Sequence, residues 1–560
     1  MQSRMEKRTG GQVLVDALQI HGVDTAYCVP GESFLAVLDA LHEARDVLRL
    51  IVCRQEGGAA HMAEAHAKLT GRPGVCFVTR GPGATNASIA VHTARQDSTP
   101  LILFIGQAGR DCMEREAWQE IDYRHMYGDI AKWVVQIEDP ARIPELISRA
   151  FHVASSGRPG PVVVSLPEDM LTQLSDVADA PAYRIARAAP EPTAMAELRE
   201  RLQSAQRPVM VLGGGGWTEQ GSQAIGRFAK AFGLPVIAGF RRQDLLDNRH
   251  PCYSGEAGLG MNPRIAERMH QADLVVAVGA RLGETSTNGY ALLDVPRPQQ
   301  TLVHVHADPN ELGRVYQADL PVAADVNAFA HAAAALSSTT NLSDERQAWL
   351  LQARRDYEDS LVPEAMPGDV NLGEVVRQVG EILGPDVIVS NGAGNYTLWV
   401  QRFHTYTGIR TQLAPTSGTM GYGVPAVIAA KLVYPQRPAV CFAGDGCFLM
   451  NGQEIATAMQ YGLDPIFVVV NNGMYGSIRM HQEKHYPGRV HGTDLHNPDF
   501  VALAQAYGLQ AELVLKTEDF APALERASKA GRAALIELRV PQDALSPKLT
   551  VSALRKQAGL

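Results

Sequence analysis

The sequence predicts an α/β protein with three parallel-sheet domains, and three observations carry that prediction. At 560 residues the chain is too long for one hydrophobic core, since domains average roughly 150 residues. Its composition, 46% hydrophobic and 20% charged, is that of an ordinary globular protein. One short pattern also recurs three times along the chain, which indicates three units of the same kind.

The recurring pattern is a proline-led apolar run that ends in a Gly-rich turn. The three copies are RPGVCFVTRGPG (72–83), RPVMVLGGGGWT (207–218) and RPAVCFAGDGCF (437–448). A second proline-led apolar run follows each copy, and the prolines, each pair 27 positions apart, are Pro73 and Pro100, Pro208 and Pro235, and Pro438 and Pro465. An Ala-rich segment with helical spacing lies between the runs, so each unit is typical of a βαβ crossover in a parallel sheet.

Domain boundaries are predicted where the composition shifts. An Ala- and Pro-rich stretch covers residues 176–194, and a polar stretch covers 338–360. Both compositions favour linkers over core elements. We therefore expect domains at 1–175, 190–340 and 360–550.

The charge and hydropathy of the chain exclude several function classes. A net charge of −9 over this length gives no electrostatic case for binding nucleic acid or an anionic membrane. No apolar stretch approaches the roughly 18 residues needed to cross a bilayer, and the start MQSRMEKRTGG has no signal-peptide pattern. We expect a cytoplasmic protein whose partners are small molecules.

Asp445 stands in GDG at the end of the apolar run AVCFAG, where a parallel sheet gathers its ligands. The next predicted strand, DPIFVVVNN, ends at Asn471 and Asn472, so Asp445 and Asn472 are expected side by side. A buried carboxylate without a partner costs on the order of several kcal/mol. A carboxylate, an amide oxygen and a Gly-rich helix start suit Mg²⁺ that carries a diphosphate. The alternative, which the Asn pair disfavours, is an Asp that only caps the following helix.

The GDG and NN pair resembles the diphosphate-binding motif of thiamine diphosphate enzymes. The resemblance extends over nearly the whole chain, to the acetolactate synthase, pyruvate oxidase and 2-oxo acid decarboxylase branch. It implies a pyrimidine-binding domain, a central Rossmann-like domain and a diphosphate-binding domain, in that order. The further motifs that carry it are RQEGGAAHMAEAHAKLTGRPGVCFVTRGPGATN (54–86), WQEID (118–122), SNGAGNYTLW (390–399) and APTSGTMGYGVPAVIAA (414–430).

The resemblance implies roles for the residues that would hold the cofactor. Glu56 is expected to hydrogen-bond the aminopyrimidine ring and promote the tautomer that activates the cofactor. A glutamate at a helix start is also favourable by itself, by up to ~1 kcal/mol, so a structural role is the alternative. Gly418 is expected to accept the cofactor amine through its carbonyl, and Met420 to hold the cofactor in a bent form.

The same resemblance implies the contacts of the metal and the diphosphate. Mg²⁺ is expected to be held by Asp445, Asn472 and the backbone carbonyl of Met474. The residues expected to face the diphosphate, through backbone or side chain, are Gly394, Asn395, Tyr396, Gly446 and Cys447.

The expected substrate residues depart from the acetolactate synthase pattern. Gln119, in Trp-Gln-Glu where the family has Phe-Gln-Glu, is free to bond a substrate oxygen. Glu32 stands where acetolactate synthases carry a small residue and simple decarboxylases carry an Asp, and a carboxylate there could shuttle the proton that releases an aldehyde. His481 falls where acetolactate synthases place a tryptophan that selects the second 2-oxo acid. The acceptor pocket is therefore expected to differ.

Other polar residues have two interpretations or no predicted role. Arg281 stands where the family has an arginine for the acceptor carboxylate or a flavin, but a solvated arginine is the alternative. His481 and His485 are spaced i, i+4, but HQEKH is not the HExxH motif, so no zinc site is predicted. His92 faces either the site or the core, and the sequence leaves this open.

The resemblance also bears on further cofactors and on assembly. The GGGG of the central repeat lacks the GxGxxG spacing of a dinucleotide fingerprint. Relatives bind FAD, ADP or nothing in this domain, so FAD stays open. The pyrimidine and diphosphate domains of one site come from different subunits in the family, which implies a homodimer with shared active sites, and relatives are commonly homotetramers.

We therefore predict an enzyme that depends on thiamine diphosphate and Mg²⁺, decarboxylates a pyruvate-like 2-oxo acid and ligates the enamine to a 2-oxo acid or aldehyde acceptor. The alternative is a non-ligating decarboxylase of the benzoylformate or pyruvate type, because of Glu32 and His481. An NAD-dependent dehydrogenase would explain GGGG but leave Asp445 and Glu56 without a role. A catalytically silent relative would be expected to lack Glu56.

Overall fold

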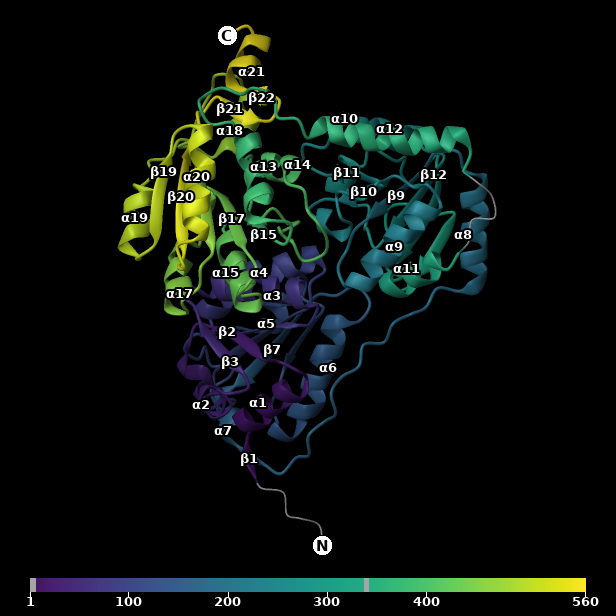
Figure 1. Cartoon of the computed structure of the whole chain (residues 1–560). Helices are drawn as coiled ribbons and strands as arrows, with labels where there is room; N and C mark the ends of the chain where they lie inside the picture. Colours follow the sequence, from purple (N-terminus) through teal and green to yellow (C-terminus); the bar gives the residue numbers. More distant parts are fainter. Residues whose placement is uncertain (1–6, 337–341) are drawn as a thin grey trace. The chain divides into compact units, whose positions relative to one another are not determined.

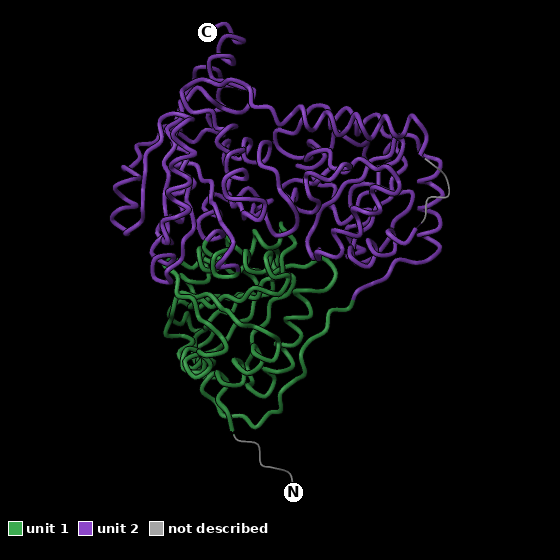
Figure 2. Tube along the Cα trace, viewed as in Figure 1, with its two compact units in different colours: residues 1–186, 428–433 green, residues 187–427, 434–560 purple. Residues whose placement is uncertain are grey.

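The computed structural model describes residues 7–336 and 342–560, whose elements form two compact units (Figure 1, Figure 2). The first unit consists of the described parts of residues 1–186 with 428–433, and the second of those of 187–427 with 434–560. They contain three six-stranded sheets in which all neighbouring strands are parallel. The predicted α/β class with three parallel sheets is confirmed.

The first sheet, in the first unit, has the order β3-β2-β4-β5-β7-β6. Its strands are β2 (Thr25–Cys28), β3 (Arg49–Val52), β4 (Gly74–Val78), β5 (Leu101–Gln107), β6 (Trp133–Gln136) and β7 (Pro161–Pro167). A short antiparallel pair joins β1 (Arg8–Thr9) to β8 (Leu174–Ser175). The helices are α1 (Gly10–Ile20), α2 (Leu35–Glu43), α3 (Glu56–Thr70), α4 (Pro82–Asp97), α5 (Tyr123–Tyr127), α6 (Ile143–Ser155) and α7 (Glu168–Thr172).

The second sheet has the order β11-β10-β9-β12-β13-β14, which is the doubly wound Rossmann order. Its strands are β9 (Pro208–Leu212), β10 (Val236–Gly239), β11 (Tyr253–Ala257), β12 (Leu274–Val278), β13 (Thr301–His306) and β14 (Leu320–Ala323). The helices of this part of the chain are α8 (Pro192–Ser204), α9 (Glu219–Ala231), α10 (Pro263–Gln271), α11 (Val326–Ala334) and α12 (Asp344–Ser360).

The third sheet has the order β16-β15-β17-β18-β20-β19. Its strands are β15 (Ile388–Asn391), β16 (Gln412–Leu413), β17 (Ala439–Gly444), β18 (Ile466–Asn471), β19 (Gln510–Val514) and β20 (Ala534–Arg539). The chain ends in a hairpin of β21 (Ala544–Ser546) and β22 (Leu549–Thr550) before its last helix. The helices are α13 (Leu372–Leu383), α14 (Thr397–Phe403), α15 (Gly423–Val433), α16 (Asp445–Phe448), α17 (Ile455–Gln460), α18 (Gly476–His485), α19 (Phe500–Ala506), α20 (Thr517–Ser528) and α21 (Val551–Gln557).

The three repeats of the sequence occupy the middle of the three sheets. In each copy the two proline-led runs form neighbouring parallel strands, which are β4 with β5, β9 with β10, and β17 with β18. Counted in chain order, the first and third sheets have the same strand order, 2-1-3-4-6-5. The resemblance between residues 72–83 and 437–448 therefore reflects equivalent positions in two sheets of the same topology.

The cores of the domains lie against these sheets. Every residue of β5 and β7 is buried, as expected for strands covered by helices on both faces. In the third sheet the apolar faces of α13, α14 and α20 pack on β15, β17 and β20, and α13 contacts α20 directly (Figure 1). The strands are thereby fixed, so the loops at their carboxyl ends start from defined positions.

The predicted domain ranges 1–175, 190–340 and 360–550 stay predictions. The strands of each sheet lie within one of these ranges, but the compact units divide the chain differently, at residue 186 and around 428–433. Position 340 lies outside the described residues.

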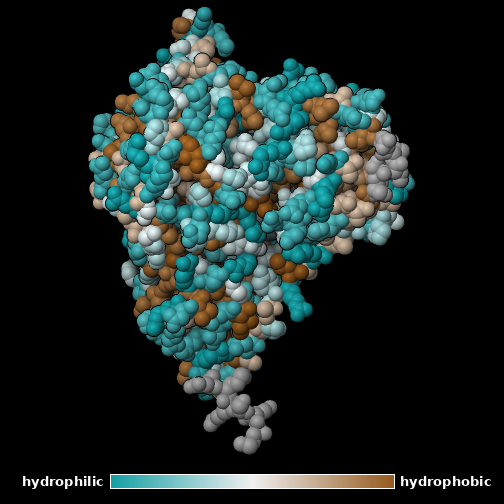
Figure 3. All heavy atoms as spheres, in the orientation of Figure 1, coloured by the Kyte–Doolittle hydropathy of each residue, from teal (hydrophilic) through white to brown (hydrophobic). Residues whose placement is uncertain are grey.

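The distribution of hydrophilic and hydrophobic residues on the surface is that of an ordinary globular protein, as the composition predicts. Hydrophilic residues cover most of the face drawn in Figure 3, with hydrophobic residues in small groups between them. Within residues 7–336 and 342–560, no helix is both long enough and apolar enough to cross a bilayer.

Candidate active site

The strand order creates a switch point in the first sheet and another in the third. The order reverses between β2 and β4 in one, and between β15 and β17 in the other. Ligands of parallel α/β sheets bind at such points, beyond the carboxyl ends of the strands. Predicted site residues stand in the segments that follow three of these strands, with Glu32 after β2, Gly394 after β15 and Asp445 after β17.

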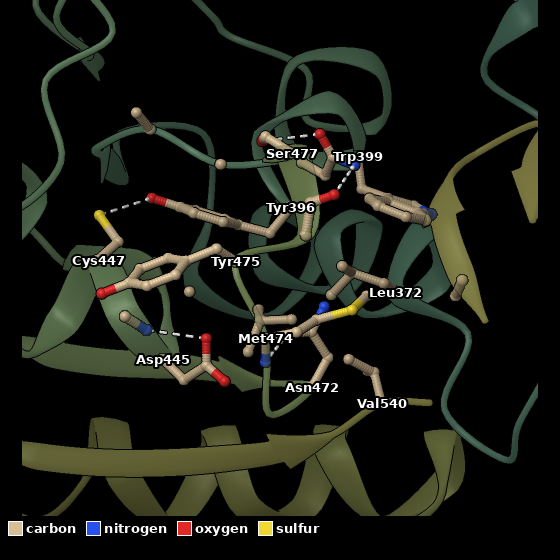
Figure 4. Close-up of a pocket in the computed structure, with 18 of the residues that line it drawn as sticks. Leu372, Tyr396, Trp399, Asp445, Cys447, Asn472, Met474, Tyr475, Ser477 and Val540 are labelled. Atoms are coloured by element: carbon tan, nitrogen blue, oxygen red, sulfur yellow. Dashed lines mark hydrogen bonds between the residues drawn. The ribbon is translucent and has the colours of Figure 1, made fainter. Parts of the chain in front are cut away.

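One cavity of about 200 Å³ lies at the switch point of the third sheet (Figure 4). Apolar side chains form one end of it, among them Leu372, Trp399 and Val540. The structure brings the predicted metal and cofactor residues together, although their roles stay predictions. The predicted residues that line the cavity are Gly394, Asn395, Tyr396, Gly418, Met420, Asp445, Gly446, Cys447, Asn472 and Met474.

Asp445 is 3% exposed and is the first residue of α16. Its Oδ1 accepts a hydrogen bond from the Gly446 N–H, and its Oδ2 accepts from the Gly473 N–H and from Asn497 Nδ2, each at 2.8 Å. Burial raises the pKa of the carboxyl above its usual value, although these donors act in the opposite direction. In the part of the chain that the structure describes, no lysine or arginine forms an ion pair with Asp445.

Asn497 is a residue of this site that the sequence analysis missed. Its Nδ2 donates to Asp445 Oδ2 at 2.8 Å and to Asn471 Oδ1 at 3.0 Å. It lies 52 positions beyond Asp445, in the loop before α19. No motif marks this position, because only the tertiary fold returns the loop to the strand ends.

The groups around Asp445 fit a hard cation. Among the described residues the donors to this carboxylate are neutral, so no side-chain cation compensates its negative charge there. Asn472 lies at the end of the neighbouring strand, and its Oδ1 accepts from the Met474 N–H at 3.2 Å. Carboxylate, amide and backbone carbonyl oxygens are the ligands that Mg²⁺ takes in proteins. The residues present therefore fit a magnesium ion, which stays a prediction.

The wall beside Asp445 brings backbone close to the cavity. A Cβ on Gly446 would lie 2.6 Å from the Tyr475 ring, so only glycine fits there without a shift. The Tyr396 hydroxyl accepts from the Gly392 N–H at 3.0 Å and lies 3.4 Å from Cys447 Sγ (Figure 4). Burial raises the pKa of that hydroxyl well above its usual value. A neutral, glycine-rich wall of this kind leaves room for the backbone to approach phosphate oxygens.

Glu56 is the first residue of α3, in the first unit. Asn86 Nδ2 donates to Glu56 Oε2 at 2.9 Å. The side chain of Gln55 caps the helix by accepting from the Gly58 N–H at 2.9 Å, so the helix start does not depend on Glu56. The carboxylate is half-buried, oriented by an amide and free of a capping role.

Gln119 lies in an irregular loop on the same side of the first sheet as Glu56. Its φ is 64°, in the left-handed region, and its Oε1 is buried without a hydrogen-bond partner among the described residues. A Cβ on Gly81 would lie 2.8 Å from the Gln119 Cβ, so the loop packs directly on the end of β4. The neighbouring residue Trp118 is 71% exposed. The unsatisfied Gln119 oxygen can accept a hydrogen bond from a ligand.

Glu32 faces a cation that the sequence analysis did not assign. Its Oε1 lies 3.5 Å from Arg80 Nη2, and Arg80 is 7% exposed. Arg80 Nη1 also donates to Glu168 Oε2 at 3.2 Å. The two carboxylates at this end of the sheet therefore share one guanidinium, in contrast to Asp445.

Several predicted residues lie elsewhere. His481 is exposed on α18, one turn beyond Ile478, which lines the cavity, and its ring stacks on His485 with centroids 6.4 Å apart. His92 is exposed on α4. Arg281 is half-buried in the loop after β12. No group of three His, Cys, Asp or Glu residues positioned for a metal occurs among the described residues.

The GGGG segment of the central repeat makes close backbone contacts. The Gly213 N–H donates to the Val278 carbonyl at 3.1 Å, and a Cβ on Gly214 would lie 2.3 Å from the Gly279 carbonyl oxygen. The loops after β9 and β12 thus touch at the switch point of the second sheet. Their glycines allow this contact, which accounts for the motif without a nucleotide.

Three protein-family models match the chain in the order of its three sheets. The N-terminal TPP binding domain of thiamine pyrophosphate enzymes matches residues 8–126, and the central domain of these enzymes matches 195–333. Their C-terminal TPP binding domain matches residues 392–538, which hold the cavity lined by Asp445 and Asn472.

Curated relatives of the chain are similar over most of their length. The acetolactate synthase large subunit of Corynebacterium glutamicum is 31% identical, over 96% of this chain and 88% of that protein. The protein of the same name from Parasynechococcus marenigrum is 34% identical, over 92% and 86%. The one from Lactococcus lactis is 32% identical, over 90% and 88%.

Proposed function

Because the chain belongs to the thiamine pyrophosphate enzyme family, we propose that it decarboxylates a 2-oxo acid and joins the remaining fragment to a second carbonyl compound. A carboligase or decarboxylase that uses thiamine diphosphate is the enzyme type of this family branch. Acetolactate synthase-like carboligation is the reaction that the relatives favour. The observation that carries the proposal is the Asp445 carboxylate, which is buried at a switch point and accepts from neutral donors among the described residues.

Mg²⁺ is the cation that we assign to this carboxylate. Asp445, Asn472 and the carbonyl of Met474 would hold it, and the cofactor diphosphate would complete its coordination. When bound, thiamine diphosphate supplies the electron sink that lets a 2-oxo acid lose CO₂. Gly394, Asn395, Tyr396 and the Gly446–Cys447 backbone would line the diphosphate. The Gly446 N–H also donates to Asp445 Oδ1, and this hydrogen bond would orient the Asp445 carboxylate toward the metal.

The chain's own groups have separate tasks in this proposal. Glu56 would hold a proton at its carboxylate and exchange it with the cofactor ring, with Asn86 fixing the carboxylate orientation. The buried Gln119 Oε1 would orient the substrate through a hydrogen bond. The apolar end of the cavity near Leu372 and Trp399 would exclude water.

The assembly that this function requires is at least a homodimer. Glu56 belongs to the first unit and Asp445 to the second, and we propose that one complete site combines them from two subunits. A homotetramer is the further proposal. Size-exclusion chromatography with light scattering measures the state, and a stable, active monomer would contradict it.

A non-ligating decarboxylase is the second candidate, and Glu32 supports it. Its side chain is 54% exposed at the switch point of the first sheet, where it could pass a proton to the decarboxylated fragment. Such an enzyme would release a free aldehyde.

Product analysis distinguishes the two candidates. The purified protein, supplied with thiamine diphosphate and Mg²⁺, is incubated with pyruvate and separately with benzoylformate, and the released CO₂, aldehydes and hydroxy-carbonyl products are measured. Ligated products favour the carboligase, and free aldehyde alone favours the decarboxylase. No CO₂ from either acid or from a wider panel of 2-oxo acids would contradict both. An absorbance spectrum of the purified protein tests for FAD in the central domain.

A further inference from the structure

Arg80 joins three segments at the switch point of the first sheet. It follows β4 and is 7% exposed. Its Nε donates to the Trp118 carbonyl at 3.1 Å, and its Nη1 donates to Glu168 Oε2 at 3.2 Å. Its Nη2 lies 3.5 Å from Glu32 Oε1, which is longer than an ordinary N–H···O hydrogen bond. One positive charge thus stands between two carboxylates, and its contact with Glu32 is the looser one.

The backbone that carries Glu32 is fixed on both sides. A Cβ on Gly31 would lie 2.5 Å from the Thr79 Cβ, and Ser33 Oγ lies 2.9 Å from Thr79 Oγ1. A Cβ on Gly106 would lie 2.2 Å from Ser33 Oγ. The loop therefore packs against the ends of β4 and β5 without spare room. The side chain of Glu32, in contrast to this backbone, is 54% exposed.

Glu32 and Arg80 lie on the same edge of the sheet as Glu56. The segment that begins with Arg80 continues into α4, where Asn86 donates to Glu56 at 2.9 Å. A Cβ on Gly83, between them, would lie 3.4 Å from Glu56 Oε1. Arg80 thus stands six positions before Asn86, which is the hydrogen-bond partner of the proposed catalytic carboxylate.

We propose that Glu32 and Arg80 determine acceptor specificity, and that they select an uncharged aldehyde over a second 2-oxo acid. The inference rests on the proposed function. Glu32 already faces the Arg80 guanidinium, so this cation is not free to pair with the carboxylate of a second 2-oxo acid. Its own negative charge also repels that carboxylate, since like charges brought together cost binding energy. An aldehyde carries no charge and meets neither obstacle.

The reaction balances with an aldehyde acceptor. The bond between the carbonyl carbon and the carboxylate of the donor breaks, and CO₂ leaves. A new carbon–carbon bond joins that carbonyl carbon to the aldehyde carbon, and the aldehyde oxygen takes up one proton. One 2-oxo acid anion, one aldehyde and one proton thus give CO₂ and a 2-hydroxy ketone, with no oxidant or reductant.

A competition experiment tests the proposal. The holoprotein receives pyruvate as donor with equal concentrations of acetaldehyde and 2-oxobutanoate, and the 2-hydroxy ketone is separated from the branched 2-hydroxy-3-oxo acids. We expect the wild type to form mainly the hydroxy ketone. Glu32→Gln removes the competing charge and frees Arg80 Nη2, so the ratio of hydroxy acid to hydroxy ketone should rise at least about tenfold.

Two variants serve as controls. Glu32→Asp keeps the negative charge and should stay within about twofold of the wild-type ratio. Glu145→Gln removes a carboxylate from the exposed Arg142–Glu145 pair and should not change the ratio. Thermal unfolding of each variant verifies that it folds.

Each outcome decides the proposal. A wild type that forms mainly the hydroxy acid, or a Glu32→Gln ratio equal to that of the wild type, would overturn this inference alone, provided that CO₂ is released. No CO₂ release from any 2-oxo acid would overturn the proposed function, and this inference with it.

Discussion

Asp445 and Glu32 are two carboxylates at the switch points of two sheets that share one strand order. Asp445 is 3% exposed and accepts hydrogen bonds from neutral groups, among them the N–H groups of Gly446, Gly473 and Asn497. Glu32 has a side chain that is 54% exposed and faces the guanidinium of Arg80. The topology is the same at both points, but the charge balance differs.

The difference separates a carboxylate that we propose binds an external cation from one that already faces an arginine side chain. A buried carboxylate without a cationic side chain is stabilised when an external cation binds, because burial disfavours its charge. A carboxylate that already faces an arginine is stabilised little further by a metal ion. Such a carboxylate instead influences which charged ligands can bind beside it. One topology therefore supports two kinds of site, depending on which side chains the loops supply.

The largest effect is expected from Glu56, a third carboxylate, held by an amide. Glu56→Gln keeps the size of the side chain and its contact with Asn86 but removes the carboxylate to which we assign the proton exchange. We expect turnover of a 2-oxo acid to fall by about 10²–10⁴-fold, with cofactor affinity unchanged within a few-fold. Steady-state kinetics and cofactor titration by fluorescence measure both quantities. Glu145→Gln, on the exposed surface, is the control, and unchanged turnover of the Glu56 variant would contradict the assigned role.

The second prediction tests the unpaired charge of Asp445. Asp445→Asn should weaken binding of Mg²⁺ with thiamine diphosphate by about 10²–10³-fold, since removing one partner of a buried charge pair costs about 3–5 kcal/mol. The free energy of unfolding of the cofactor-free protein should change by less than about 1.5 kcal/mol, the net contribution of one hydrogen bond. Calorimetry and urea unfolding measure the two values.

Asp494→Asn is the matched control for that variant. The Asp494 carboxylate lies 3.3 Å from the Arg479 guanidinium, and its side chain is 68% exposed. Asp494 is therefore an aspartate that already has a cationic partner. Equal loss of cofactor affinity in both variants would contradict the comparison between the two kinds of carboxylate.

Much of the fold and of the cavity was predictable because short patterns mark strand ends. The proline-led runs locate neighbouring strands, and GDG and NN mark the ends of β17 and β18, which a parallel sheet brings to one edge. Asn497 and Arg80 could not be predicted. Asn497 reaches Asp445 only through the tertiary course of the loop before α19, and the partners of Arg80 come from three separate segments. Neither arrangement leaves a period or spacing in the sequence.

The third prediction tests how firmly the Glu32 loop is held. Gly106→Ala would place a Cβ 2.2 Å from Ser33 Oγ, and such overpacking typically costs about 1–3 kcal/mol. We expect a lower free energy of unfolding and a changed ratio of acceptor products, because the loop that carries Glu32 must shift. Gly283→Ala is the control, since nothing lies within 4 Å of its Cβ position. A Gly106 variant as stable as the Gly283 variant would show that the loop is more adaptable than its packing indicates.

The last prediction concerns the dependence of stability on acid, and it tests whether folding depends on groups other than the site carboxylates. Burial lowers the pKa of His404 to about 4. Because this pKa lies below the unfolded value of about 6.5, the unfolded state binds the extra proton between the two. The stability present above pH 6.5 is therefore lost as the pH falls toward 4, by up to about 1.4 kcal/mol per pH unit for one histidine.

His404→Phe should reduce this slope, measured by urea unfolding from pH 7 to 4.5, whereas His270→Gln, at an exposed position, should leave it unchanged. An unaltered slope in His404→Phe would assign the acid sensitivity to other buried groups. The next residues to replace are His61 and His66 in the first unit, because burial lowers their pKa values to about 3 and about 4.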